Sequence, residues 1–103
     1  MFSLRDRGNS LSDLVEMRAS LRRQQIVLTG ALRDVQSELR SWERHRTACA
    51  AQGTAVPREL GILWEELGDR ERELAMDVVQ VEAALRETNA EIRACLAPRP
   101  IAS

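Results

Sequence analysis

Apolar residues recur every seven positions along the first half of the chain. The series is Leu14, Leu21, Leu28, Val35, Trp42 and Cys49. Three positions before members of this series stand further apolar residues, Leu11, Leu32 and Leu39. This is the heptad pattern of a coiled-coil helix, with the series at position d and the residues three before it at position a. A helix with such an apolar stripe needs a partner helix to cover it.

The second half of the chain repeats the pattern. Position d holds Leu60, Leu67, Leu74, Val81, Thr88 and Cys95, and position a holds Trp64, Glu71, Val78, Leu85 and Ile92. The two stripes therefore predict two long helices that cover each other. The two cysteines are expected to fill the stripe as small core residues.

Residues that begin and end helices divide the two stripes. Ser10 and Asp13 have the spacing of a capping box at a helix start, and Gly53 suits the left-handed residue after a helix end. Pro57 suits the first residue of a second helix. We predict helices over about 11–52 and 57–97 with a turn at 53–56, a flexible leader at 1–9 and a flexible tail at 98–103.

A turn this short makes the two helices antiparallel neighbours. Folding the chain at Gly53 sets Trp42 opposite Trp64, and the other a and d residues match in the same register. The second helix carries more acids than arginines while the first carries more arginines than acids, which favours pairing within one chain. The fold class is therefore all-α, a long antiparallel two-helix coiled-coil hairpin, which a second chain would complete to a four-helix bundle.

Polar residues interrupt the apolar stripe at several a and d positions. Arg46 faces Leu60, Arg18 faces Thr88, and Gln25 and Glu71 occupy further a positions. In one interpretation the long polar side chains reach out of a narrow seam to solvent. In the other, a second molecule completes their interactions, and the polar residues then select the partner.

The hairpin has more apolar residues than its stripe uses, and this surplus is the candidate partner-binding surface. Two glycines one heptad apart add a flank that another helix could approach closely, although glycine could also be tolerated there without a role. The predicted partner-binding residues are Val15, Met17, Ile26, Val27, Gly61, Gly68, Ala75, Met76 and Val79. The expected partner is a second copy, giving a homodimer, or another helical protein.

Composition narrows the possible functions of the 103-residue chain. Its net charge is −1 and only 3% of its residues are aromatic, so it has neither a strong field for nucleic acid nor a large globular core. No apolar stretch is long enough for a membrane span, and the N-terminus lacks the apolar segment of a signal peptide. A cytoplasmic, reducing setting is the default, with secretion that needs no cleaved signal left open.

Few residues suggest chemistry. The one histidine, His45, lies a helical turn from Cys49, but no third ligand or orienting acid accompanies the pair. A small basic patch formed by Arg40, Arg44, His45 and Arg46 is flanked by acids, which disfavours nucleic-acid binding. We expect no catalytic, cofactor-binding or metal-binding residues, no cofactor and no small-molecule substrate, and therefore no enzyme.

The sequence thus predicts a non-catalytic helical hairpin that acts through protein–protein interaction, in an assembly, adaptor or scaffold role. The alternative is a secretion-apparatus component or chaperone that folds fully with its partner. In its length and in Trp42 before the turn, the chain is similar to small secreted helical hairpins of the Trp-x-Gly type, although Arg44 stands where that motif has Gly. In architecture and composition it resembles the stalk protein of flagellar and type III export ATPases. These residues identify no family.

Overall fold

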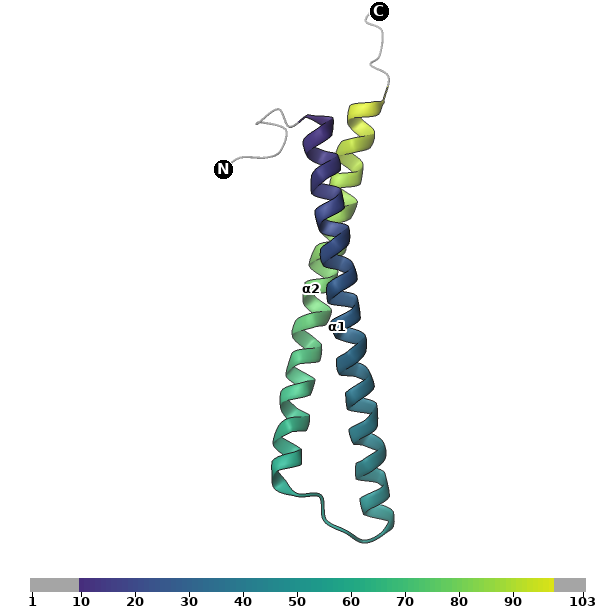
Figure 1. Ribbon diagram of the computed structural model, residues 1–103, viewed down its shortest axis with the longest axis vertical. Helices are drawn as coiled ribbons and strands as arrows, with labels where there is room; N and C mark the ends of the chain where they lie inside the picture. The colour runs from purple at the N-terminus through teal and green to yellow at the C-terminus, as the bar shows by residue number, and fades with distance from the viewer. Residues whose placement is uncertain (1–9, 98–103) are drawn as a thin grey trace, which may run out of the picture. The chain divides into compact units, whose positions relative to one another are not determined.

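The computed structural model describes residues 10–97, so the predicted leader and tail lie outside the described residues. The described chain consists of two helices, α1 (Leu11–Ala51) and α2 (Arg58–Leu96), and contains no strand (Figure 1). The fold class is the predicted one: all-α, with two long helices that form a hairpin. Neither helix contains a segment long and apolar enough to cross a membrane within residues 10–97.

The start of α1 carries the predicted capping box. The backbone amide of Asp13 donates to Ser10 Oγ at 3.2 Å, and the amide of Ser10 donates to Asp13 Oδ2 at 3.3 Å. The first amides of a helix have no carbonyl partner within it. Two of them are satisfied here by the two side chains, which fixes where α1 begins.

The end of α1 is set by Gly53, whose φ of 69° lies in the left-handed region that favours glycine. Its amide donates to the carbonyl of Ala50 at 3.2 Å, and the amide of Thr54 donates to the carbonyl of Cys49 at 2.8 Å. This pair of bonds is the Schellman motif. Pro57 then directly precedes α2, and its carbonyl accepts from the amide of Leu60 at 3.1 Å.

The chain divides into two compact units, and each has its own part of the core. The described part of unit 1 comprises residues 10–25 and 80–97, where the beginning of α1 packs against the end of α2. Its buried residues all occupy predicted a or d positions: Leu14, Val81, Leu85, Thr88 and Ile92. The Thr88 hydroxyl donates to the carbonyl of Ala84 at 2.8 Å, which satisfies this one polar member of the core.

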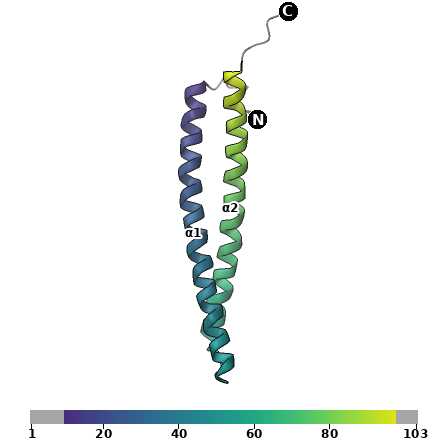
Figure 2. The same ribbon diagram turned by 90° about the vertical axis from the view of Figure 1, so that its right-hand side faces the viewer.

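Unit 2, residues 26–79, is the hairpin around the turn, shown from two sides in Figures 1 and 2. Leu74 and Cys49 are buried, and the other apolar a and d residues are half-buried. Leu28, Leu32, Leu39 and Leu67 belong to this half-buried set. The heptad stripe therefore faces the partner helix in unit 2 as well, with one stripe of each helix covered.

The prediction that both cysteines fill the core is wrong for Cys95, which is exposed, whereas Cys49 is buried. Cys95 lies in the last turn of α2. Leu11, the a residue opposite it in the predicted register, is itself 37% exposed because α1 begins there. Within residues 10–97, neither helix adds a further turn to the seam at this end of unit 1. Both cysteines are free thiols.

Candidate protein-interaction surfaces

A groove on one side of unit 2 shows how the flanks of the two helices are arranged. Gln36 and Glu43 of α1 and Gly68 of α2 line this groove, which has a volume of about 540 Å³. All three residues occupy heptad position e, directly after d. The e positions of both helices therefore lie on the same side of the hairpin, as antiparallel pairing requires.

We call this side the e flank and define it by five of the predicted partner-binding residues. Gly61, Gly68 and Ala75 occupy position e of α2. Ile26 and Val79 occupy position b, which neighbours position e at a spacing of three or four residues along each helix. By their heptad positions, these five residues, which come from both helices, therefore fall on one face of unit 2.

The apolar side chains at one end of the e flank are open to solvent. Ile26 is 72% exposed and Val79 is 57% exposed. Ala75, at position e, is half-buried. A β-branched aliphatic side chain left in water at both b positions gives up the burial free energy of about 1.5–3 kcal/mol that each could contribute. Ile26 and Val79 are therefore unpartnered apolar side chains on the e flank.

The glycines of the e flank have open space where a side chain would stand. A Cβ at Gly61 would meet no heavy atom within 4 Å, and one at Gly68 would lie 3.7 Å from Arg72 Nη1, an ordinary contact. Both residues are within α2 and neither has a positive φ. Nothing in the hairpin itself therefore requires glycine at these positions.

The remaining predicted partner-binding residues lie elsewhere. Val27 and Met76 are exposed in unit 2 but occupy positions c and f, away from the e flank. Val15 is 40% exposed and belongs to unit 1. Met17 is half-buried in unit 1, where its sulfur lies 3.7 Å from the Thr88 hydroxyl oxygen. Met17 thus already has a contact across the helix pair.

The polar residues in the seam are accommodated within the hairpin. Arg18, Gln25 and Glu71 are half-buried, and Arg46 is exposed. Across residues 10–97, no buried side-chain nitrogen or oxygen lacks a hydrogen-bond partner. This agrees with side chains that reach solvent from a narrow seam, the first of the two interpretations.

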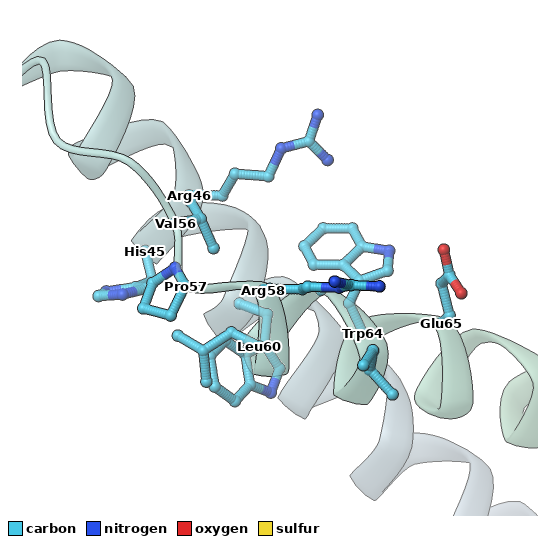
Figure 3. A pocket seen from close by; sticks show the side chains of 11 residues that line it. His45, Arg46, Val56, Pro57, Arg58, Leu60, Trp64 and Glu65 are labelled. Carbon is cyan, nitrogen blue, oxygen red and sulfur yellow. The ribbon is translucent and has the colours of Figure 1, made fainter.

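A second surface feature lies beside the turn, where the end of α1 faces the start of α2 (Figure 3). This tip pocket has a volume of about 750 Å³, within the range of about 300–1,000 Å³ typical of ligand sites. Both tryptophans of the chain line it. The full lining is Trp42, His45, Arg46, Val56, Pro57, Arg58, Leu60, Gly61, Ile62, Trp64 and Glu65.

The heptad explains why the tip pocket is open. Arg46 occupies the a position opposite Leu60, where an apolar side chain would otherwise fill the seam. Its guanidinium instead lies over the indole of Trp64, with its central carbon 5.4 Å from the ring centroid, in a cation–π contact. Gly61 adds no side chain on the other wall. The result is an apolar recess with cations at its edge.

The charged groups at the tip pocket are unpaired within the described chain. Arg46, Arg58 and Glu65 line the pocket, and none of them forms an ion pair with another residue in the range 10–97. Two cations and one carboxylate give the rim a net positive charge. Unpaired arginines beside an apolar recess are suited to carboxylates, which guanidinium binds through two parallel hydrogen bonds.

His45 contacts two neighbours on its own helix. Its ring meets that of Trp42 edge-to-face with centroids 6.1 Å apart, and its Nε2 lies 3.7 Å from Cys49 Sγ. The indole of Trp42 thus contacts this imidazole, and among the described residues it makes no ring contact with Trp64. No group of three or more His, Cys, Asp and Glu side chains within residues 10–97 could hold a metal ion.

Sequence reasoning named the Arg46–Leu60 pair but not the pocket that results from it. The signal was present in the heptad, because a charged residue opposite an apolar one next to a turn leaves the seam unfilled.

Comparisons with known proteins add nothing to this geometry: no protein-family model, no curated protein and no solved structure matches the chain. The two surfaces are therefore the basis for a functional proposal.

Proposed function

We propose that this chain is a non-catalytic helical-hairpin protein that acts through protein–protein interaction, in an assembly, adaptor or scaffold role. The observation that carries the proposal is the exposure of Ile26 and Val79 on the same flank of unit 2. Exposed apolar side chains that gather on one side of a folded chain commonly mark a place where another molecule binds. A helix laid along the e flank would cover both side chains.

The partner we favour is a second copy of the chain, which would complete a four-helix bundle. The e flank offers apolar side chains at one end and glycines at the other, so a helix can approach the backbone closely along it. Helices in bundles pack with axes about 8–10 Å apart, and the short distances require small residues. The alternative function, in which a partner completes the polar seam, is less well supported because the buried polar groups of residues 10–97 are already satisfied.

The test replaces Ile26 and Val79 with glutamate. A matched control places the same two charges at Ser37 and Gln80, which are exposed polar residues outside the e flank. Light scattering on size-separated protein across a dilution series, with circular dichroism on the same samples, gives oligomeric state and helicity. We expect a dimer for the wild type and the control, and a dissociation constant at least about tenfold higher for the e-flank variant, which corresponds to about 1.4 kcal/mol.

Two results would contradict the proposal. Equal association of the e-flank variant and its control removes this flank as the contact. A wild-type chain that stays monomeric and folded at every concentration excludes self-assembly. In that case a photo-crosslinking side chain at position 26, compared with one at position 37 in the native host, tests for a different protein partner. Equal cross-linking at the two positions would refute the interaction role.

A further inference from the structure

We infer that the tip pocket is a second binding site, which shares only Gly61 with the e flank and takes an apolar side chain from an acidic segment of another protein. The site goes beyond the proposed function, since it lies beside the turn and does not use Ile26 or Val79. Three features of the described residues support it: an apolar recess, unpaired cations at its edge, and a backbone fixed on both sides of it.

The recess provides apolar contact area that the hairpin does not use. The indoles of Trp42 and Trp64 and the side chain of Leu60 are only half-buried, although all three occupy a or d positions. Sites for peptide anchors are lined in this way, by aromatic and aliphatic groups with a few polar groups at the edge. Inserting one bulky apolar side chain would remove this surface from water and fill the space that Arg46 leaves.

The charge at the edge selects the kind of segment. Arg46 and Arg58 form no ion pair within the described chain, so an incoming acid does not have to displace one. Arg46 stacked on Trp64 is held by the ring while its N–H groups remain free to donate. Glu65 is the single opposing charge in the lining, and it weakens the preference for acids without reversing it.

The backbone around the pocket is fixed by local bonds. The Schellman motif ends α1 on one side, and Pro57, with its restricted φ, leads into α2 on the other. A pocket whose walls are fixed in advance loses less conformational entropy when a segment binds. These features point to recognition by insertion of a side chain into a preformed recess.

The chain provides its own probe for the test. It has two tryptophans and no tyrosine, and both tryptophans line the tip pocket, so intrinsic tryptophan emission reports on this site. The ligand used is the peptide acetyl-Glu-Glu-Phe-Glu-Glu-amide. Its matched control is the same peptide with lysine in place of each glutamate, and free N-acetylphenylalanine is the third ligand. Titrations run at a concentration where light scattering shows one species.

We expect saturable change in emission with the acidic peptide, and affinity at least about fivefold lower for the lysine peptide. The double variant Arg46→Gln with Arg58→Gln should weaken binding of the acidic peptide about five- to tenfold, because two exposed ion pairs are lost. Arg33→Gln, an exposed arginine outside the pocket, should leave binding unchanged. Glu65→Gln should strengthen binding about two- to threefold, and added salt should weaken it.

Several outcomes would overturn the inference. Absence of any saturable change in the wild type refutes the site, and equal binding of the acidic and lysine peptides refutes the role of the arginines. Binding of N-acetylphenylalanine as tight as that of the peptide would assign the pocket to a small ligand and refute a protein segment. The peptide comparison uses the wild type alone, so a variant that fails to fold leaves the test intact. Self-association, measured on the e-flank variants, remains a separate result.

Discussion

Replacing the two e-flank glycines with alanine should have opposite effects on folding and on assembly. Gly61 and Gly68 are interior residues of α2, where glycine is less favourable than alanine by about 0.8–1.0 kcal/mol. An added methyl group has open space at Gly61 and an ordinary 3.7 Å contact with Arg72 at Gly68. Because no clash offsets the gain in helix propensity, the double variant should raise the free energy of unfolding of the single hairpin by about 2 kcal/mol.

The assay is urea denaturation followed by circular dichroism, at a dilution where light scattering shows only monomer. For a urea dependence of about 1–3 kcal/mol per molar, the gain moves the midpoint up by about 0.7–2 M. Gly30→Ala is the control. Gly30 is an exposed helical glycine of α1 outside the e flank, and a Cβ added to it would meet no heavy atom within 4 Å. This substitution should stabilise the monomer by about 1 kcal/mol.

Assembly separates the two sets of variants. If a second helix packs closely on the e flank, methyl groups at Gly61 and Gly68 should raise the dissociation constant of the assembly, whereas Gly30→Ala should not. A monomer destabilised by alanine at Gly61 or Gly68 would refute the reasoning, because it would mean that the backbone there is already in close contact. Unchanged assembly in a stabilised double variant would leave these glycines without a role in the contact.

Three further predictions concern the core and the thiols. Leu74→Ala, at a residue 2% exposed, should cost about 2–5 kcal/mol in urea denaturation, whereas Leu63→Ala, at a residue 45% exposed, should cost much less; equal losses would contradict the assigned core. Cys95 should react with a thiol reagent in the native state at least about tenfold faster than Cys49, and equal rates would place Cys49 in solvent. Thr88→Val should change stability by less than about 1 kcal/mol, because an apolar residue of similar shape suits this buried position; a larger loss would show that the hydroxyl is required.

The heptad was sufficient to predict the fold. It specifies which side of each helix is covered, and the spacing of Ser10 with Asp13 and the position of Gly53 specify where α1 begins and ends. Both signals are local in sequence, and the hydrogen bonds that bear them out join residues at most five positions apart. Local rules of this kind need no knowledge of the rest of the molecule.

The surfaces were less predictable, because a heptad position does not give a side-chain direction or the amount of covering at a helix end. Arg46 was placed opposite Leu60, but its stacking on Trp64 and the open recess beneath it depend on rotamers. Cys95 follows the heptad yet is exposed, because it lies in the last turn of α2, where the described seam ends. Met17, a predicted partner-binding residue, also has its sulfur 3.7 Å from the Thr88 hydroxyl oxygen, a contact that its heptad position does not specify.

The distribution of buried residues has a consequence for the order in which the hairpin folds and opens. Contacts beside the turn join residues close in sequence, so their loop-closure entropy is small, yet Trp42, Leu60 and Trp64 are only half-buried there. In unit 1 the Met17–Thr88 contact joins residues 71 positions apart, in the unit that holds most of the buried residues. If contacts formed in order outward from the turn, folding would therefore begin where the least apolar surface is buried. Forming the contacts of unit 1 early is not prevented by their separation in sequence, because the entropic cost of closing a loop rises only slowly with its length. Within residues 10–97, amide hydrogens of α1 and α2 beside the turn should therefore exchange with solvent before those of the buried residues of unit 1, and a segment bound in the tip pocket should slow that exchange.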